Sequence, residues 1–256
     1  MIKEETKLCA SNIFEGMTSI RALIYAMEEG ISDRRIEKIL VDESKISKNK
    51  KELGYLRAIS GQYQFVIETV DEQTISSMAL GNSHGGLLAV ASVRTIEPLT
   101  ADKISDNGFY CLMDGIEDPY NFGYSLRSLY ACGCCGILLP ERNWMSAAGV
   151  VCRSSAGASE RFSMYTADPV EIIRMFKEKG YTVVCAEEKT EHILGKCELP
   201  LPILLLVGGE KRGISKKVLE QADLLVKIDY AREFRASLSA ASATTMFAYE
   251  IARQNF

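Results

Sequence analysis

The run Ile203-Leu204-Leu205-Leu206-Val207 is followed directly by Gly208-Gly209. An uninterrupted apolar run that ends in glycine is typical of a strand buried on both faces, the strand type of parallel sheets. Shorter apolar runs of the same kind occur at 109–113, 137–139, 182–185 and 224–228. Because glycine at a strand end lets backbone groups approach a ligand closely, the pattern predicts an α/β domain with a ligand site at the carboxyl ends of its strands.

Helix signals alternate with these strands. Asp168-Pro169-Val170-Glu171 forms a capping box with proline at the first helical position, and Gly180 can end the helix that it opens. Ser215 is expected to cap a short helix, and a last helix is expected over about 238–254. The alternation predicts a mostly parallel sheet with helices on both faces.

The first hundred residues alternate in the same way. Apolar residues at 20, 23, 24 and 27 follow the spacing of an amphipathic helix that Gly30 can end. Strands are expected at 36–41, 63–67 and 87–93, and helices at 50–60 and 71–78. The stretch 96–102, which contains Pro98, breaks this pattern. We therefore expect two domains, 1–100 and 107–256.

Composition limits the possible functions. The chain has 256 residues, of which 47% are hydrophobic and 25% are charged, enough to bury a core in each of two domains. It contains no apolar run of membrane-spanning length, and Met1-Ile2-Lys3-Glu4-Glu5 lacks an apolar signal core, so we expect a cytoplasmic protein with no membrane contact. A net charge of −4 argues against a uniform electrostatic attraction for nucleic acid.

Local basic clusters remain compatible with RNA binding. Between residues 32 and 57 there are eight basic and five acidic residues. A solvated helix surface is the alternative interpretation of this stretch. The side chains that we expect to contact RNA phosphates are Arg34, Arg35, Lys48, Lys50 and Lys51, together with Arg212 in a later basic cluster.

The cysteines do not predict a metal site. Cys132-Gly133-Cys134-Cys135 is the one cluster in the sequence, and it provides neither two separated ligand pairs nor a nearby histidine. We expect small buried thiols and no metal.

A dinucleotide site of the Rossmann type is the default hypothesis for a parallel sheet. It requires Gly-x-Gly-x-x-Gly after the first strand, and none of the nineteen glycines stands two residues from another. The absence of this motif disfavours a nicotinamide-dependent dehydrogenase and a methyltransferase of the Rossmann type.

Four segments resemble, in order and spacing, the motifs of the SpoU/TrmH branch of the SPOUT RNA methyltransferases. They are 112–123 with Arg127, Ser155-Ala156-Gly157-Ala158, the strand and loop 206–214, and Ser237-Leu238. Gly16 with the helix that follows it, and 83–90, are similar to the ribosomal-L30-like (L30e-like) domain of that family. The resemblance implies an L30e-like RNA-binding domain, a trefoil-knotted SPOUT sheet, S-adenosylmethionine as cofactor, and a homodimer that methylates a ribose 2′-hydroxyl of rRNA or tRNA.

The resemblance also implies roles for single residues. A cationic side chain near the ribose oxygen would stabilise the alkoxide that develops there, and the family assigns this role to the position of Arg127. The implied reactive side consists of Asn121, Arg127, Glu210, Ser237 and Ser239. The implied cofactor side consists of Leu206, Val207, Gly208, Gly209, Gly213, Ile228, Ser237 and Leu238.

Three departures from the family pattern leave a second hypothesis open. Relatives usually carry Ser-Leu-Asn-Val-Ser where this chain has Ser237-Leu238-Ser239-Ala240-Ala241, and Ile-Pro-Met where it has Ile228-Asp229-Tyr230. Gly209 replaces a common Asn, a change that we expect to be without consequence. The changes at Ser239 and Ala241 allow an alternative, an RNA-binding protein that kept the fold and lost catalysis. For the dimer, the last helix offers Ala240, Ala243 and Ala248 as a close-packing face.

Overall fold

The computed structural model describes residues 12–140, 147–209, 213–234 and 236–256. The chain forms two compact units: unit 1 comprises 1–95 and 143–161, and unit 2 comprises 96–142 and 162–256. The chain therefore passes between the units three times, near 95, 142 and 161. The expected division at 100–107 lies close to the first passage. It did not anticipate that 147–161 packs with the N-terminal unit.

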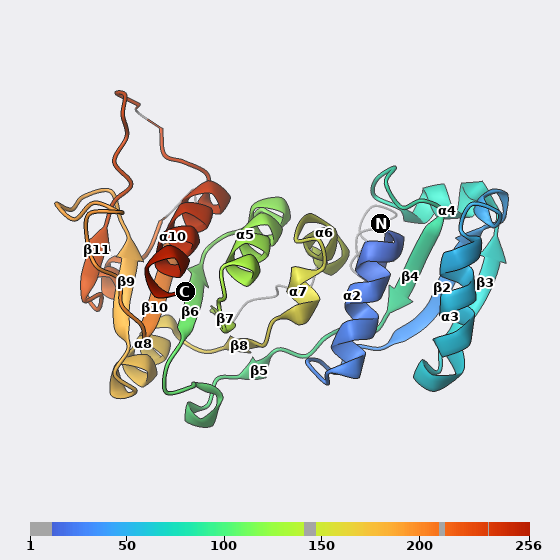
Figure 1. Ribbon diagram of the computed structural model, residues 1–256, viewed down its shortest axis with the longest axis horizontal. Coiled ribbons are helices and arrows are strands. Elements are labelled where there is room, and N and C mark those ends of the chain that lie inside the picture. Colours follow the sequence, from blue (N-terminus) through green and yellow to red (C-terminus); the bar gives the residue numbers. More distant parts are fainter. Residues whose placement is uncertain (1–11, 141–146, 210–212, 235) are drawn as a thin grey trace, which may run out of the picture. The chain divides into compact units, whose positions relative to one another are not determined.

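Unit 1 is a four-stranded mixed sheet with the order β1-β4-β2-β3. Its strands are β1 (Ile13–Glu15), β2 (Ile36–Asp42), β3 (Val66–Val70) and β4 (Leu87–Ala91) (Figure 1). The β2–β3 pair is parallel, whereas β4 pairs antiparallel with β1 and with β2. Its helices are α2 (Gly16–Glu28), α3 (Lys50–Tyr63), α4 (Glu72–Met78), α6 (Ala148–Ser154) and α7 (Ala158–Arg161). The core includes Phe14, Leu23, Ile39 and Leu56, and Cys152 of α6 joins it.

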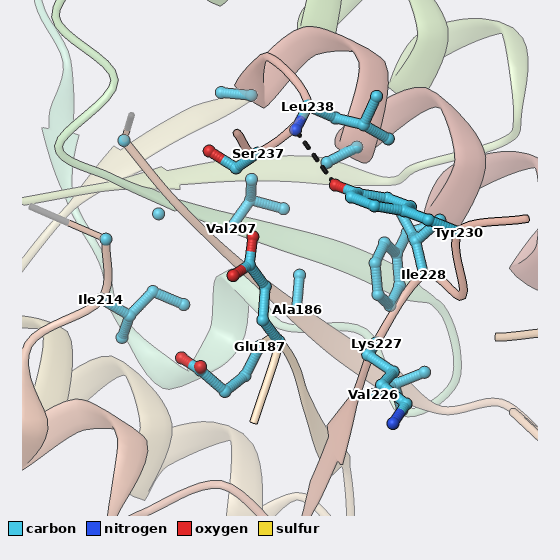
Figure 2. Close-up of a pocket in the computed structure, with 17 residues that line it drawn as sticks. Ala186, Glu187, Val207, Ile214, Val226, Lys227, Ile228, Tyr230, Ser237 and Leu238 are labelled. Carbon is cyan, nitrogen blue, oxygen red and sulfur yellow. Dashed lines mark hydrogen bonds between the residues drawn. The ribbon is translucent and has the colours of Figure 1, made fainter. Parts of the chain in front are cut away.

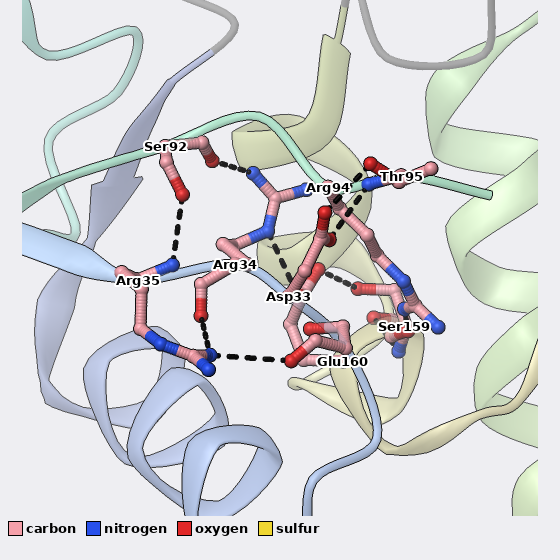
Figure 3. Close-up of polar contacts among 10 residues, drawn as sticks. Asp33, Arg34, Arg35, Ser92, Arg94, Thr95, Ser159 and Glu160 are labelled. Carbon is pink, nitrogen blue, oxygen red and sulfur yellow. Dashed lines mark hydrogen bonds and ion pairs between the residues drawn. The ribbon is translucent and has the colours of Figure 1, made fainter.

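A buried ion pair holds α7 in unit 1. Arg34 Nε donates to Glu160 Oε2 at 3.1 Å, and the two side chains are only 2% and 3% exposed (Figure 3). Arg34 also donates to the carbonyl of Ser92, and Arg94 donates to the carbonyl of Ser159. Removing one member of a buried pair leaves an uncompensated charge and costs about 3–5 kcal/mol. The pair therefore fixes the segment 147–161 to the N-terminal strands.

This burial corrects the expectation that Arg34 contacts RNA. A guanidinium enclosed by Glu160 and Ser92 cannot reach a phosphate in solvent. Arginine is almost always at the surface unless it is paired, and its partner here lies 126 residues away, so composition alone could not identify the exception. The other candidates of this cluster, Arg35, Lys48, Lys50 and Lys51, are exposed.

Unit 2 contains a seven-stranded sheet with the order β11-β9-β10-β6-β7-β8-β5. Every strand pair in it is parallel, which confirms the predicted fold class. The strands are β5 (Glu97–Pro98), β6 (Phe109–Asp114), β7 (Gly136–Leu139), β8 (Met164–Thr166), β9 (Thr182–Ala186), β10 (Ile203–Gly208) and β11 (Leu224–Val226). The helices are α5 (Pro119–Ala131), α8 (Pro169–Glu178), α9 (Lys216–Leu219) and α10 (Ala240–Asn255). The trefoil knot and the L30e-like character of unit 1 stay predictions.

Side-chain caps fix the starts of three helices in unit 2. Asp168 accepts from the backbone N–H groups of Val170 and Glu171, as the capping box predicts. Asp118 caps α5 in the same manner. Ser239 caps α10 by accepting from Ser242 N at 3.1 Å, so Ser237 and Leu238 precede the helix that they were expected to open.

The alanines of α10 do not form a surface for a partner. Ala240 and Ala248 are buried within this chain, and Ala243 lines a pocket. The cysteine expectation is correct in part: Cys134 is buried, and burial raises the pKa of its thiol, but Cys135 is exposed. Within the described ranges, no group of His, Cys, Asp or Glu residues could hold a metal ion. No helix in those ranges has the length and apolar character that crossing a membrane requires.

Candidate active site

A pocket of about 220 Å³ lies at the carboxyl ends of β9 and β10 in unit 2 (Figure 2). Four stretches of chain contribute to its wall: the end of β9 with the two residues that follow it, the end of β10 with Gly209, Gly213 and Ile214, the end of β11 with residues up to Tyr230, and residues between 237 and 247 before and within α10. The pocket is therefore at the edge of the sheet where parallel α/β folds bind ligands.

Glycines let the backbone close tightly around the pocket. Gly208 pairs with Asp114 at the end of β6, and a Cβ atom on Gly208 would lie 2.6 Å from the carbonyl carbon of Gly213. A Cβ atom on Gly209 would collide with the carbonyl oxygen of Gly115. Position 209 thus has no room for a side chain in this conformation. The expectation that glycine in place of the family's Asn is without consequence stays a prediction.

Tyr230 ties two walls of the pocket together. Its hydroxyl oxygen accepts a hydrogen bond from Leu238 N at 3.2 Å, which joins the segment after β11 to the segment before α10 (Figure 2). The ring of Phe234 lies 6.1 Å from that of Tyr230. Because Ile228, Tyr230 and Leu238 all line the pocket, this hydrogen bond holds two of its loops together.

Charged side chains also line the pocket. Glu187 and Glu188 follow β9, and Lys227 follows β11. The backbone N–H of Glu187 donates to Val226 O at 3.0 Å, so the two strand ends are held side by side. Sequence reasoning missed these three residues. The rule that ligands bind beyond the carboxyl ends of parallel strands could have indicated Glu187, because it follows a strand that was predicted.

Comparison with known proteins identifies the family to which the chain with this pocket belongs. The model of the SpoU rRNA Methylase family matches residues 108–249, more than half of the chain. The protein belongs to the SpoU rRNA Methylase family. The match begins just before β6 and ends within α10, so it spans every stretch that forms the pocket.

Relatives of known structure or name cover between 73% and 99% of this chain. A crystal structure described as an RNA 2′-O ribose methyltransferase has a TM-score of 0.79 at 23% identity, covering 99% of this chain and 95% of its own. An AdoMet-bound rRNA methyltransferase from Sinorhizobium meliloti has a TM-score of 0.78 at 20% identity and covers 98% and 94%. The 23S rRNA (guanosine-2′-O-)-methyltransferase RlmB of Shewanella oneidensis is 26% identical over 193 residues, 73% of this chain and 78% of RlmB.

Most of the expected cofactor residues of this SpoU chain lie together. Those that line the pocket are Val207, Gly208, Gly209, Gly213, Ile228, Ser237 and Leu238. Leu206 does not line it, because its side chain points into the core of unit 2 and is 1% exposed. Alternation along β10 explains the difference, since neighbouring side chains of a strand lie on opposite faces. Glu210 and Arg212 lie outside the described residues.

Three of the expected reactive residues of the SpoU chain, Asn121, Arg127 and Ser239, do not line this pocket. Asn121 and Arg127 lie on α5, neither lines the pocket, and Arg127 is exposed. A 2.6 Å hydrogen bond between the hydroxyls of Ser128 and Thr245 fastens α5 to α10. Ser239 is outside the pocket wall, and its hydroxyl caps α10. Of the expected reactive set, Ser237 alone among the described residues lines the pocket.

Proposed function

We propose that this protein is an RNA methyltransferase that uses S-adenosylmethionine to methylate a ribose 2′-hydroxyl of rRNA or tRNA, in the cytoplasm as expected from the sequence. The observation that carries the proposal is the convergence of Val207, Gly208, Ile228, Ser237 and Leu238 on one pocket. Family membership supports methyl transfer. The names of the relatives support the ribose 2′-oxygen as acceptor and AdoMet as methyl donor.

The pocket has the chemistry that S-adenosylmethionine requires. Apolar side chains of Val207, Ile214 and Phe247 offer a surface for a flat heterocycle. No side chain at Gly208 or Gly209 blocks the approach of a ligand to this strand end. The N–H of Gly209 donates to Asp114 O and its carbonyl accepts from Gly213 N, so these bonds hold the strand end in place. The carboxylates of Glu187 and Glu188 suit a ligand with a ribose diol and a cationic ammonium group.

The chain supplies a cation for the reaction step. S-adenosylmethionine provides a methyl group on a sulfonium, and the accepting 2′-oxygen must lose its proton as the bond forms. A guanidinium near that oxygen stabilises the developing negative charge, and the exposed Arg127 is free of ion pairs among the described residues. No imidazole lines the pocket within the described ranges, so a histidine base has no support here.

The proposal includes a homodimer that completes the active site. Arg127 does not line the pocket of its own chain, and the exposed faces of α5 and α10 carry large apolar side chains. These are Tyr120, Tyr124, Met246 and Tyr249, each 43–62% exposed. Exposed apolar side chains on two helices that contact each other favour association, and a second copy would bring another Arg127 toward the pocket.

One observation favours the alternative of an RNA-binding protein without catalysis. The hydroxyl of Ser239 accepts from Ser242 N and lies 3.0 Å from Ser242 Oγ. The Ser239 hydroxyl therefore caps the start of α10, at a position where relatives carry an Asn, whose side-chain amide has a longer reach. If this position must bind the ribose, the chain would hold RNA and cofactor and transfer no methyl group.

Methyl incorporation into RNA tests the proposal directly. Total RNA from a strain that lacks the gene would be incubated with the purified protein and S-adenosylmethionine carrying a labelled methyl group. The proposal predicts label in rRNA or tRNA, retained as a 2′-O-methylnucleoside after digestion. Confirmed cofactor binding without label in any RNA would support the binding-protein alternative and contradict the enzyme assignment.

A further inference from the structure

Unit 1 contains a second pocket, of about 410 Å³, that shares no residue with the pocket of unit 2. Its wall is formed by the start of α2, Asn49 and the start of α3, the loop before β4, Arg153 near the end of α6, and Ala156 between α6 and α7. We propose that this pocket binds the unpaired base of one guanosine of the substrate RNA. This inference rests on the proposed function, because it requires that the protein act on RNA.

Polar atoms without partners face this pocket. Asn49, only 8% exposed, donates its Nδ2 to the carbonyl of Gly85 at 2.9 Å, and within the described ranges its Oδ1 has no partner. The carboxylate of Glu52, in the first turn of α3, likewise has no hydrogen bond or ion pair to any described residue. His84 accepts from Gly86 N through Nδ1, so the neutral ring carries its proton on Nε2 and can donate there. The Asn49 oxygen, the Glu52 carboxylate and the Nε2–H of His84 are therefore available to hydrogen-bond a ligand in this pocket.

The charge balance favours a base over a phosphate. The pocket is lined by two carboxylates, Glu15 and Glu52, and one guanidinium, Arg153. Arg153 is already paired with Glu15 at 2.5 Å. A phosphate would therefore bring its negative charge beside Glu52 without an unpaired cation to offset it. A neutral ring with N–H groups meets no such penalty, and a volume of about 410 Å³ is within the range of small-molecule sites.

Guanine is the base whose edge matches the available atoms. It presents two adjacent donors, N1–H and the 2-amino group, which suit the two oxygens of a carboxylate such as Glu52 in a bidentate pair. Its O6 and N7 are acceptors that suit His84 Nε2–H or the N–H groups at the start of α2. The N-cap residue of α2, Glu15, makes no side-chain hydrogen bond to the first N–H groups of the helix, so no side-chain cap occupies those groups. Uracil has no amino group, and adenine and cytosine each lack a ring N–H beside theirs.

Left-handed backbone conformations shape the pocket. Gly16, Gly85 and Gly86 have φ between +61° and +82°, and Ala156 has φ +52°, a conformation that residues with a side chain rarely adopt. Gly16 lies against the loop before β4, since a Cβ atom there would be 3.5 Å from Ser83 O. The glycines adopt this conformation without strain, whereas strained non-glycine residues such as Ala156 are concentrated at ligand sites, where the surrounding structure maintains them. Ala156 belongs to the Ser155–Ala158 motif, so the SpoU-family segment contributes directly to this wall.

The test measures base preference by fluorescence anisotropy without S-adenosylmethionine. Labelled pentanucleotides UUNUU, with N as G, A, C, U or inosine, would be titrated with the full-length protein. We expect UUGUU to bind about tenfold more tightly than UUUUU, in keeping with the discrimination of one bidentate base contact. The inosine pentamer, which lacks the 2-amino group, should lose most of this preference. Equal affinity for G and U in the wild type would overturn the proposal.

Two matched variants assign the preference to the pocket. Glu52→Gln should weaken UUGUU binding about tenfold and leave UUUUU unchanged, because the amide cannot accept both guanine donors. Glu37→Gln removes the same charge from an exposed site on β2 outside the pocket, and it should retain the full preference. A preference that survives Glu52→Gln would overturn the proposal. Methyl transfer to cellular RNA with equal pentamer affinities would contradict this inference alone, whereas guanine preference without methyl transfer would contradict only the proposed function.

Discussion

The two sides of the candidate active site differ in how completely one chain builds them. The cofactor side converges: the ends of β9, β10 and β11 and the start of α10 enclose one pocket. The reactive side does not, because Arg127 and Asn121 lie on α5 outside that pocket. The ends of neighbouring strands are held together by the hydrogen bonds of the sheet. The surface of a helix, by contrast, can contribute to a site that is formed with another molecule. This difference is the basis of our proposal that one chain binds the cofactor and that a second copy completes the reactive side.

The largest expected effect comes from removing the charge on the reactive side. Arg127→Ala should lower the single-turnover rate of methyl transfer about a hundredfold, by analogy with the loss of an oxyanion donor. Cofactor affinity, measured by calorimetry, should stay unchanged because Arg127 does not line the pocket. Arg174→Ala, at an exposed arginine on α8, is the matched control and should leave both quantities unaltered. Parallel loss of binding and turnover would make Arg127 structural.

A substitution on the cofactor side should instead lower the affinity for the cofactor. Gly209→Ala places a methyl group against the carbonyl of Gly115, so the loop must move and cofactor affinity should fall about thirtyfold, roughly 2 kcal/mol. Gly54→Ala in α3 is the control, since a Cβ atom there meets nothing within 4 Å. Calorimetry with S-adenosylmethionine distinguishes the two glycines. Unchanged affinity in Gly209→Ala would show that the tight backbone approach is not needed for binding.

Binding of the substrate RNA should depend on a basic surface that belongs to neither the cofactor side nor the reactive side. Replacing the exposed residues Lys48, Lys50 and Lys51 with Glu should weaken RNA binding about tenfold and reduce its salt dependence, because fewer counterions are released. Cofactor affinity should not change. Titrations at several salt concentrations give the slope, and a slope equal to that of the wild type would return this segment to the solvated-surface interpretation.

The smallest effect is expected at the hydrogen bond between the two pocket loops. Tyr230→Phe leaves Leu238 N without its acceptor, so the loops should separate more easily and cofactor affinity should fall about threefold. The transfer rate at saturating cofactor should remain that of the wild type. Calorimetry and single-turnover kinetics on one preparation measure both quantities. A lower rate at full saturation would place Tyr230 on the reactive side instead.

Sequence patterns predicted the elements whose signals are local. The apolar run 203–207 is β10, and the capping box at Asp168 starts α8. The missed features depend on partners far away in the chain. Arg34 is buried because Glu160 lies beside it, and position 209 excludes a side chain because Gly115 lies against it. Neither neighbour is visible in a linear pattern, so the place of 147–161 in unit 1 and the need for Gly209 could not be predicted.

Mixed dimers test the central claim, that two copies together form the active site. A subunit that carries Arg127→Ala would be paired with a differently tagged subunit that carries Ala243→Leu, whose larger side chain should fill the cofactor pocket. The heterodimer would be purified by its two tags. Each parent should be inactive. If Arg127 serves the pocket of the partner, the heterodimer contains one intact site, and it should recover about half of the wild-type transfer activity for two independent sites. A heterodimer as inactive as its parents would show that each chain uses its own Arg127, and it would contradict the account.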